Sequence, residues 1–291
     1  MLAKVYLEIT DVCNLACSFC AGTARERRFL SREEFRKLAE KIRPHTAYLY
    51  FHLMGEPLLH PLLGDFLQTA HALGFKVILT TNGTRLNETA ETLLAAPALF
   101  KVSISLHALE ANTGLDERRY LAGCFDFADR ASKRGIITVF RLWNDGGRNT
   151  RNGALLDALR SRFPDGEWAA NTKGTRIRQK LFIENGEAFD WPSHAPHERE
   201  RVTCYALKDH VGVLCDGTVV PCCLDYDGKL ALGNLFDTSL DEILCSERAR
   251  AFRASLDKAF APSELCRRCG FAQNKFRRSP SVRTFTTEEL T

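Results

Sequence analysis

The sequence predicts an α/β fold, a partial (β/α)6 TIM-like barrel followed by a small cysteine-rich C-terminal domain. Strand-like and amphipathic helical segments alternate through about the first 185 residues, which is typical of a parallel sheet built from βα units. The length of 291 residues suits one incomplete barrel with an appendage. Seven of the eleven cysteines lie beyond residue 190. We therefore expect a barrel domain at residues 1–190 and a second domain at residues 191–291.

Six strands and five helices are expected to alternate along the first domain. The strand candidates are residues 5–10, 47–53, 75–80, 101–106, 136–142 and 176–183. A capping box from Ser31 to Glu34 precedes the first helix, whose apolar positions are Phe35, Leu38 and Ile42. The other helices are expected at residues 64–73, between the Asn82-Gly83 turn and Pro97, at 125–134 and at 154–163.

Polar side chains recur on one face of these strands. Ser103, Ser105 and His107 alternate with apolar side chains along the strand at 101–106. The same alternation occurs in three other sets: Tyr6, Glu8 and Thr10; Tyr48, Tyr50 and His52; and Arg176, Arg178 and Lys180. A closed barrel fills its interior with apolar side chains, so this pattern favours an open, solvated lumen for a polar ligand, or else a solvated sheet edge. We expect His52 and His107 to be hydrogen-bonded lumen residues rather than ligands.

The regular alternation of strand-like and helical segments ends at about residue 191. Residues 191–197 are typical of a linker, and residues 211–214 and 219–220 predict a hairpin around Asp216-Gly217. A helix is expected at about residues 239–256. This region is too small for a large hydrophobic core, so we expect bound metal to stabilise it.

Composition excludes several classes of protein. The chain is 45% hydrophobic and 26% charged, as globular proteins are. Its net charge of +4 is too small to predict nucleic acid as a partner. The sequence has no apolar run of membrane-spanning length and no signal-peptide pattern at its start, so we expect a cytoplasmic protein without a membrane partner. Cytoplasmic cysteines stay reduced, so closely spaced ones indicate metal ligands rather than disulfides.

Cys13, Cys17 and Cys20 form a C-x3-C-x2-C motif directly after the first strand. The carboxyl end of a strand is where barrel enzymes carry their reactive centre. A structural zinc ion or an ordinary iron–sulfur cluster takes four protein ligands, but the next cysteine or histidine along the chain is His45. Three thiolates on a cubane cluster leave one iron open to an exchangeable ligand, whereas zinc or a storage cluster is the alternative.

With Phe19 at its aromatic position, this motif resembles the C-x3-C-x-Φ-C signature of the radical S-adenosyl-L-methionine (SAM) superfamily. Met54-Gly55-Glu56-Pro57 is similar to the G-E-P segment that meets the amino group of SAM in that family. Residues 80–83 and 103–106 are similar to the third and fourth strand ends of the family. The resemblance implies that the three cysteines bind a [4Fe–4S] cluster with an open iron. It further implies a set of SAM-binding residues: Phe19, Gly55, Glu56, Pro57, Ser105 and Arg141. Considered apart from the other motifs, Phe19 is equally consistent with a packing residue, and Glu56-Pro57 with a simple turn.

The C-terminal cysteines resemble the SPASM extension of that family in its shortened twitch form. The matching features are Cys204, Gly217-x4-Cys222, Gly233-Asn234 and the pair Cys266 and Cys269. The resemblance implies one auxiliary [4Fe–4S] cluster on Cys204, Cys222, Cys266 and Cys269, with a zinc ribbon as the alternative.

Other residues near these cysteines have two possible roles each. Cys223 competes with Cys222 as a ligand, although the G-x4-C spacing selects Cys222. Asp225 is either a base or, our preferred interpretation, a surface residue of the hairpin. Cys124, Cys215 and Cys245 are expected to pack in the core, and the end after Ser279 to be a solvated tail.

Within the superfamily the likeness is to the radical dehydrogenases of 2-deoxystreptamine biosynthesis and covers nearly the whole chain. It implies reductive cleavage of SAM to a 5′-deoxyadenosyl radical, hydrogen abstraction from substrate and transfer of a second electron to the auxiliary cluster. The substrate would be an alcohol or a peptide side chain, clamped by Arg141, Arg178 and Lys180 unless the last two lie on the surface. A flavodoxin- or ferredoxin-type protein would supply electrons.

Two other functions remain open at this stage. A peptide maturase that forms a crosslink or an epimer is the first, although such enzymes often carry an N-terminal peptide-recognition domain and here a strand begins by residue 4. A non-catalytic iron–sulfur electron carrier is the second. A carrier would need neither a G-E-P segment nor an open iron.

Overall fold

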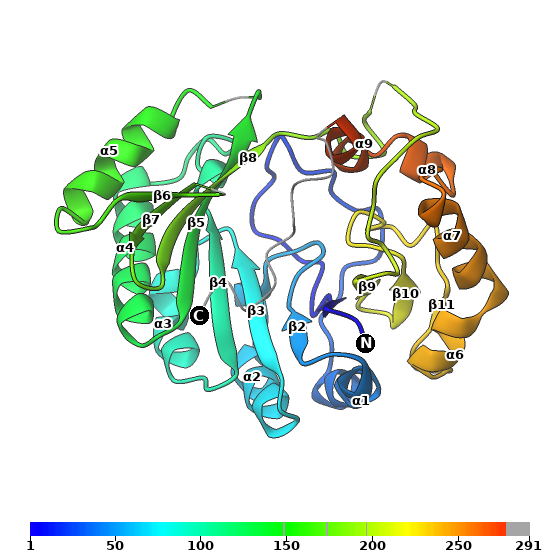
Figure 1. Ribbon diagram of the computed structural model, residues 1–291. Coiled ribbons are helices and arrows are strands. Elements are labelled where there is room, and N and C mark those ends of the chain that lie inside the picture. Colours follow the sequence, from blue (N-terminus) through cyan, green and yellow to red (C-terminus); the bar gives the residue numbers. More distant parts are fainter. Residues whose placement is uncertain (148, 173, 196, 278–291) are drawn as a thin grey trace.

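A computed structural model describes residues 1–147, 149–172, 174–195 and 197–277. Eleven strands form one sheet in the order β11-β10-β9-β1-β2-β3-β4-β5-β8-β7-β6. The six barrel strands pair in parallel with one another: β1 (Lys4–Leu7), β2 (Tyr48–Tyr50), β3 (Lys76–Thr81), β4 (Leu99–Ser105), β5 (Ile137–Asp145) and β8 (Leu181–Glu187). The first five of them lie at predicted strand positions. The sheet curves without closing on itself in the described residues (Figure 1), so the predicted α/β partial barrel is confirmed.

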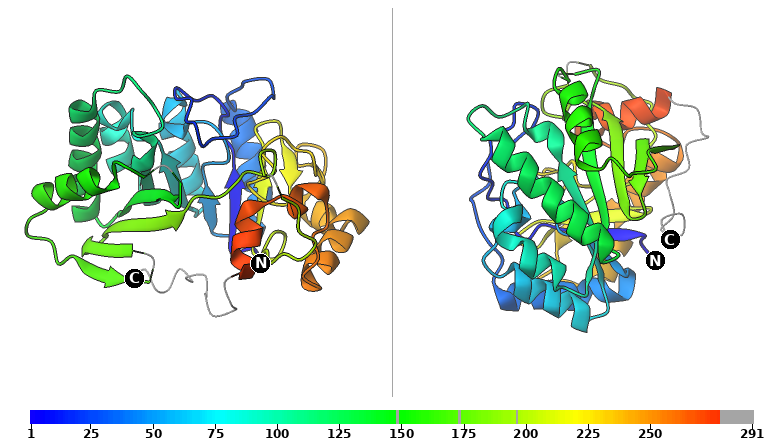
Figure 2. Two further views of the ribbon diagram at one scale, coloured as in Figure 1. Left: turned by 90° about the horizontal axis from the view of Figure 1, so that it is seen from above. Right: turned by 90° about the vertical axis from the view of Figure 1, so that its left-hand side faces the viewer.

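Five helices lie along the outer side of the barrel strands (Figures 1 and 2). They are α1 (Arg32–Ile42), α2 (Leu63–Ala72), α3 (Leu86–Leu94), α4 (Glu117–Lys133) and α5 (Asn152–Arg162). The predicted capping box begins α1, because Ser31 Oγ accepts a hydrogen bond from Glu34 N and the Glu34 carboxylate accepts one from Ser31 N. Short 3₁₀ helices follow α1, β2 and β4: η1 (Arg43–His45), η2 (Pro57–Leu59) and η3 (Leu106–Ala108). Among the described helices, none combines the length and apolarity that crossing a membrane requires.

The predicted strand at 176–183 is wrong, because the chain turns back within it. Antiparallel β7 (Gly174–Arg178) and β8 are joined at Lys180, which has a φ of +63°, and β6 (Ala169–Asn171) pairs with β7. Arg178 therefore does not share a face with Lys180. Its guanidinium binds Asp129, with 2.5 Å between Nη2 and Oδ1, and donates to Ser132 Oγ on α4. Arg178 thus contacts a covering helix and does not take the predicted substrate-clamping position.

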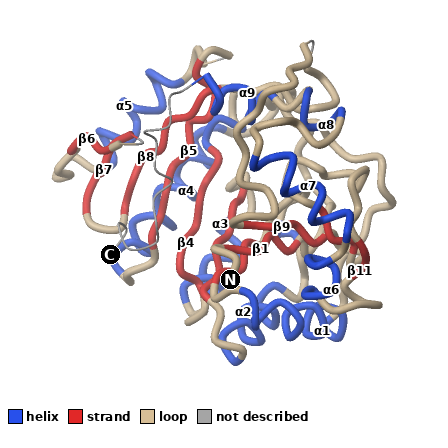
Figure 3. Tube along the Cα trace, turned by 45° about the vertical axis from the view of Figure 1, so that its right-hand side comes forward, coloured by secondary structure: helices blue, strands red, loops and turns tan. Residues whose placement is uncertain are grey.

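The C-terminal region adds three strands and four helices. The predicted hairpin is present as β9 (His210–Val213) and β10 (Thr218–Val220), with β11 (Gly233–Asn234) beyond it. β9 pairs in parallel with β1, from Lys4 opposite His210 to Leu7 opposite Val213 (Figure 3). The expected single helix is two, α6 (Leu240–Cys245) and α7 (Glu247–Asp257), because extended Ser246 interrupts it and caps α7. Two short helices, α8 (Glu264–Arg267) and α9 (Gly270–Arg277), complete the described chain.

His60 closes the turn between β2 and α2. Leu62 N donates to His60 Nδ1 at 3.1 Å, so the ring hydrogen sits on Nε2 and is donated to the Leu30 carbonyl, also at 3.1 Å. The ring packs against Phe66, with 4.5 Å between ring centroids. Burial lowers the pKa of His60 to about 4. Protonation of Nδ1 would break the bond from Leu62 N, so this turn requires a neutral imidazole.

This arrangement predicts a pH dependence of stability. The unfolded chain binds a proton at His60 near pH 6.5 and the folded chain only near pH 4, so the contribution of His60 is complete above pH 6.5 and is lost as pH falls toward 4. Between about pH 7.5 and 5.5, His60→Gln should flatten the decline in unfolding free energy by at most about 1 kcal/mol in urea titrations. His71→Gln, at an exposed position of α2, is the control and should leave the decline unchanged. Equal slopes for wild type and His60→Gln would contradict this account.

Candidate active site

The three N-terminal cysteines lie together in the loop between β1 and α1, which we call the cysteine loop (residues 8–31). Cys20 N donates to the Cys17 carbonyl at 2.9 Å and Leu15 N lies 3.5 Å from Cys13 Sγ. Cys13 and Cys20 are exposed and Cys17 is half-buried. Burial raises the pKa values of Cys13 and Cys17, and the neighbouring Cys20 thiolate raises both further. Three soft thiolates this close, at the end of a barrel strand, fit an iron–sulfur cluster with an incomplete protein ligand set.

The segment from Met54 to Pro57 is fixed against the cysteine loop by backbone contacts. Gly55 has a φ of +75°, and a Cβ added there would lie 2.4 Å from the Thr10 carbonyl oxygen and 2.9 Å from Asp11 backbone atoms. Glu56 N donates to the Val12 carbonyl at 2.8 Å. Only glycine allows both the conformation and this close approach. The predicted Gly55-Glu56-Pro57 segment is therefore in direct contact with the residues that lead to Cys13.

The Glu56 carboxylate is fully engaged by protein donors. It is 1% exposed and accepts hydrogen bonds from Thr81 Oγ1 at 2.7 Å, Asn82 N at 2.6 Å and Leu58 N at 3.0 Å. Burial raises its pKa to about 7, and these hydrogen bonds act in the opposite direction. Glu56 thus ties the end of β3 to this segment, which leaves the backbone of the segment, rather than the carboxylate, to contact a ligand.

Phe19 lies on a cavity of about 430 Å³ beside the cysteine loop. That volume falls within the range of about 300–1,000 Å³ found for small-molecule sites. The lining includes residues from the cysteine loop, from β5 itself and from beyond β4 and β8: Ser18, Phe19, His107, Glu110, Trp143, Asn144, Phe189 and Trp191. The Phe19 ring is 4.9 Å from that of His107, whose Nδ1 lies 3.0 Å from the Arg141 carbonyl oxygen. The prediction that His107 is hydrogen-bonded is confirmed.

Ser105 and Arg141 are opposite each other in the pairing of β4 with β5. The Arg141 guanidinium lies 3.6 Å from the centroid of the Trp143 indole. Burial lowers the pKa of Arg141, while nearby Glu184 opposes that shift. Sequence reasoning missed Trp143, although its spacing of two residues from Arg141 on a strand places it on the same face.

Buried polar atoms without partners mark the inner side of these strands. In the part of the chain described, Arg141 Nε, Trp143 Nε1 and His52 Nδ1 are buried and make no hydrogen bond. The prediction that His52 is hydrogen-bonded is therefore wrong for this nitrogen; its ring instead packs against Tyr6 and Tyr50. Because buried polar groups are nearly always paired in folded proteins, these three atoms indicate a surface that pairs with a polar ligand or with water.

The four predicted C-terminal ligands also come together. Burial raises the pKa of Cys222, and the neighbouring thiolates of Cys204, Cys223, Cys266 and Cys269 raise it further. Backbone N–H groups of Ala206 and Ala272 approach the sulfurs of Cys204 and Cys269 at 3.4 and 3.5 Å. Four neighbouring thiols match the number of protein ligands that a complete [4Fe–4S] site requires. In the described residues, no group of three or more His, Cys, Asp or Glu side chains is arranged to hold a single metal ion.

Cys223 lies close to Cys204 and Cys222 but also has a partner outside the cysteine group. Its thiol hydrogen-bonds to Tyr6 on β1, and Lys4 lowers its pKa against the larger effect of burial. Asp225 is not the surface residue we expected, because it is 0% exposed and its carboxylate accepts from Lys229 N and Leu230 N at 2.9 Å each. The expectation of core packing is confirmed for Cys124 and Cys215, but Cys245 is exposed. The predicted tail after Ser279 lies outside the described residues.

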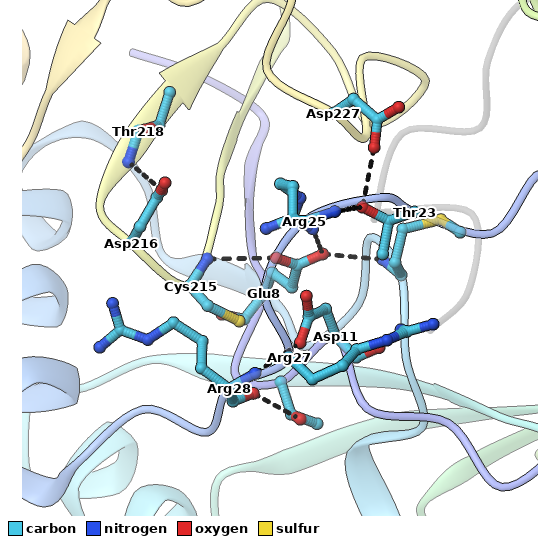
Figure 4. Close-up of polar contacts among 12 residues, drawn as sticks. Glu8, Asp11, Thr23, Arg25, Arg27, Arg28, Cys215, Asp216, Thr218 and Asp227 are labelled. Carbon is cyan, nitrogen blue, oxygen red and sulfur yellow. Dashed lines mark hydrogen bonds and ion pairs between the residues drawn. The ribbon is translucent and has the colours of Figure 1, made fainter.

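A buried ion pair connects the cysteine loop to both neighbouring regions (Figure 4). Glu8, 0% exposed, accepts from Arg25 Nη2 at 2.8 Å, from Met54 N at 3.2 Å and from Cys215 N at 3.1 Å. Arg25 belongs to the loop beyond Cys20, Met54 begins the Gly55-Glu56-Pro57 segment and Cys215 follows β9. One carboxylate therefore holds three segments that are distant in sequence, and its removal would leave the largely buried Arg25 guanidinium without the carboxylate to which it donates.

Comparison with known proteins identifies the class. The Radical SAM superfamily model matches residues 7–149, and the SPASM iron–sulfur cluster-binding domain model matches residues 204–270. The chain therefore carries a radical SAM domain followed by a SPASM domain. The first domain implies a [4Fe–4S] cluster and SAM, and the second implies auxiliary iron–sulfur binding.

Two curated relatives differ in how much of the chain they match. The S-adenosyl-L-methionine-dependent 2-deoxy-scyllo-inosamine dehydrogenase of Niallia circulans is 20% identical over 92% of this chain and 93% of its own length. GTP 3′,8-cyclase of Aquifex aeolicus is 33% identical, but the match covers 46% of this chain and 45% of the cyclase. The chain thus spans less than half of the cyclase.

Solved structures with the same fold cover nearly the whole chain. BtrN in complex with AdoMet and 2-DOIA superposes with a TM-score of 0.63 at 19% identity, over 92% of this chain and 93% of BtrN. Streptococcus suis SuiB bound to S-adenosylmethionine gives a TM-score of 0.62 at 14% identity, over 96% of this chain and 75% of SuiB. At these identities the likeness establishes the fold.

The two adjacent cysteines should differ in iron binding. Cys222→Ala should lose the auxiliary cluster, about four irons per chain, because its thiol lies among the other three ligands. Cys223→Ala, the matched control, should retain that iron, because its thiol faces Tyr6. Iron and sulfide analysis after anaerobic reconstitution measures both. Loss of iron from Cys223→Ala and not from Cys222→Ala would reverse the assignment.

Breaking the buried ion pair should destabilise the fold strongly. Glu8→Gln removes the charge of the carboxylate that is bonded to Arg25 and should lower the free energy of unfolding by about 3 kcal/mol. Glu40→Gln removes a pair whose side chains, Arg36 and Glu40, are 67% and 53% exposed, and should cost less than about 0.5 kcal/mol. Urea unfolding compares the two variants, and equal losses would contradict the account.

Proposed function

We propose that this protein is a radical SAM oxidoreductase that removes a hydrogen atom and then an electron from its substrate. The observation that carries the proposal is the backbone contact between the Gly55-Glu56-Pro57 segment and the residues leading to Cys13. An electron carrier or a zinc site does not require that contact. An enzyme that presents SAM to an open iron requires the Gly55-Glu56-Pro57 segment and the cysteine loop to be held together. When bound, the cluster and SAM supply a 5′-deoxyadenosyl radical that takes hydrogen from a substrate C–H bond.

We assign the cofactors to three sets of residues. Cys13, Cys17 and Cys20 would hold the [4Fe–4S] cluster with the open iron. SAM would be held by residues at the strand ends: Phe19, Gly55, Glu56, Pro57, Ser105 and Arg141. One auxiliary [4Fe–4S] cluster would be held by Cys204, Cys222, Cys266 and Cys269. The first and second sets belong to a domain at residues 1–190 and the third to a domain at residues 191–291.

The substrate would bind along the inner faces of β2 and β5. Arg141 Nε and Trp143 Nε1 are buried hydrogen-bond donors without partners. His52 Nδ1 is a third buried nitrogen without a partner, on a ring that packs against Tyr6. Such donors suit the oxygens of a hydroxylated or anionic molecule, hold its reacting carbon in place and take the place of water. The wall of polar side chains supports a small polar substrate.

Dehydrogenation of an alcohol or a peptide side chain completes the proposed reaction. The substrate loses one hydrogen atom to the radical, one proton to a base and one electron to the auxiliary cluster, which balances a two-electron oxidation. Likeness to the 2-deoxy-scyllo-inosamine dehydrogenase over 92% of the chain supports the alcohol. A flavodoxin- or ferredoxin-type donor and a cytoplasmic location fit this chemistry. Peptide maturation is the second candidate, because SuiB shares the fold over 96% of the chain.

Formation of 5′-deoxyadenosine tests the proposed function. Protein reconstituted anaerobically with iron and sulfide, then given dithionite and SAM, should release 5′-deoxyadenosine. Cys20→Ala should reduce the rate at least about 100-fold by disrupting the cluster. Cys245→Ala changes an exposed cysteine that belongs to neither group of proposed cluster ligands, so it should keep the wild-type rate. A reconstituted wild-type protein that releases no 5′-deoxyadenosine would refute the proposal.

Iron counting tests the second cluster. The triple variant Cys13→Ala, Cys17→Ala and Cys20→Ala should retain about four irons per chain on the C-terminal cysteines. Zinc in place of that iron would refute the auxiliary-cluster assignment while leaving the first cluster untouched.

A further inference from the structure

Asn112 lies beside the cysteine loop, although 95 residues separate it from Cys17 in sequence. It belongs to the connection between η3 and α4 and is half-buried. Its Nδ2 is 3.1 Å from Cys17 Sγ and 2.7 Å from the Ala108 carbonyl oxygen. Its Oδ1 accepts a hydrogen bond from Ala16 N at 3.2 Å. Both ends of the amide are therefore engaged, and two of the three contacts are with the cysteine loop.

These contacts determine which end of the amide faces the sulfur. The Ala108 carbonyl can only accept and the Ala16 N–H can only donate, so the NH2 group must face Ala108 and the oxygen must face Ala16. One Nδ2 hydrogen is used by Ala108 and the other points to Cys17 Sγ. A rotated amide would set two oxygens against each other and leave Ala16 N without an acceptor. The contact with Cys17 is therefore an N–H donor aimed at a thiolate.

The other sulfur contacts of the loop are longer. Asn82 Nδ2 lies 3.9 Å from Cys13 Sγ and already donates to Asn14 Oδ1 at 3.0 Å. Leu15 N lies 3.5 Å from the same sulfur. Within the described chain, Asn112 makes the shortest hydrogen bond to any of the three N-terminal sulfurs.

We propose that Asn112 sets the reduction potential of the cluster on Cys13, Cys17 and Cys20 through this hydrogen bond to Cys17. The inference rests on the proposed function, because it requires the cluster on those cysteines. Reduction adds negative charge to the cluster and its sulfurs, and an N–H donor stabilises that charge, so the bond raises the potential. Asn112 is a positioning and tuning residue, since it acts through Cys17 and reaches the reacting atoms only by way of that ligand.

Three variants separate the donor from its surroundings. Asn112→Leu removes the donor and keeps a similar volume. Asn112→Asp removes the donor and keeps one oxygen that accepts from Ala16 N, while its second oxygen faces the Ala108 carbonyl. Thr113→Asp is the matched control, because it adds the same charge at the neighbouring exposed position without touching Cys17.

A redox titration followed by electron paramagnetic resonance measures the effect on the full-length reconstituted protein. The signal of this cluster is identified as the one that changes when SAM is added. Asn112→Leu should shift the reduction equilibrium about tenfold toward the oxidised form, which is a fall of about 59 mV for one electron. Asn112→Asp should shift it at least as far, and Thr113→Asp clearly less.

The outcomes distinguish this inference from the proposed function. If wild-type protein forms a cluster that SAM perturbs, but both Asn112 variants match Thr113→Asp in potential, the inference is wrong and the proposed function stands. If neither Asn112 variant binds iron at Cys13, Cys17 and Cys20, Asn112 only supports the loop and the inference is again wrong. If wild-type protein forms no SAM-sensitive cluster, both fail.

Discussion

The site depends on the close approach of Gly55 to the backbone of Thr10 and Asp11. No side chain fits between these segments, because a Cβ at residue 55 would lie 2.4 Å from the Thr10 carbonyl oxygen. The approach brings the end of β2 against the start of the cysteine loop, and the Glu56 carboxylate then ties the same segment to the end of β3. Three consecutive strand ends are thereby fixed in one place, which is the geometry that a chelated cofactor requires.

The fold class follows from the sequence because parallel strands and amphipathic helices have different periods, and both are clear through the first domain. The error at residues 176–183 has a physical cause. Lys180 adopts a positive φ, but the turn around it contains no glycine, proline or asparagine. The polar alternation that begins at Arg176 and Arg178 therefore continues into the turn, and no residue type marks where the strand ends. The break at Ser246 was missed for a related reason, since serine is tolerated inside helices as well as at their starts.

The sequence could single out Cys13, Cys17 and Cys20 because their spacing is local, whereas it could not predict the residues that support them. Asn112 reaches Cys17 across 95 residues, and Glu8 joins Arg25, Met54 and Cys215, which no spacing in the sequence relates. Trp143 could have been predicted to share a strand face with Arg141, because the two lie two residues apart on one strand. The prediction for Asp225 was wrong because its carboxylate turns inward and accepts from backbone N–H groups of the same turn. The sequence pattern does not distinguish such a carboxylate from an exposed one.

The pairing of β9 with β1 has a consequence for how the chain matures during translation. β1 lies between β2 and β9, so one edge of the strand that leads into the cysteine loop has no neighbour until the ribosome has made residue 213. A nascent chain that contains the whole barrel still has an open strand edge beside Cys13, Cys17 and Cys20, and an open edge can pair with other chains. The sheet beside the N-terminal cysteines is therefore completed only in the last third of synthesis, long after Cys13, Cys17 and Cys20 have been made.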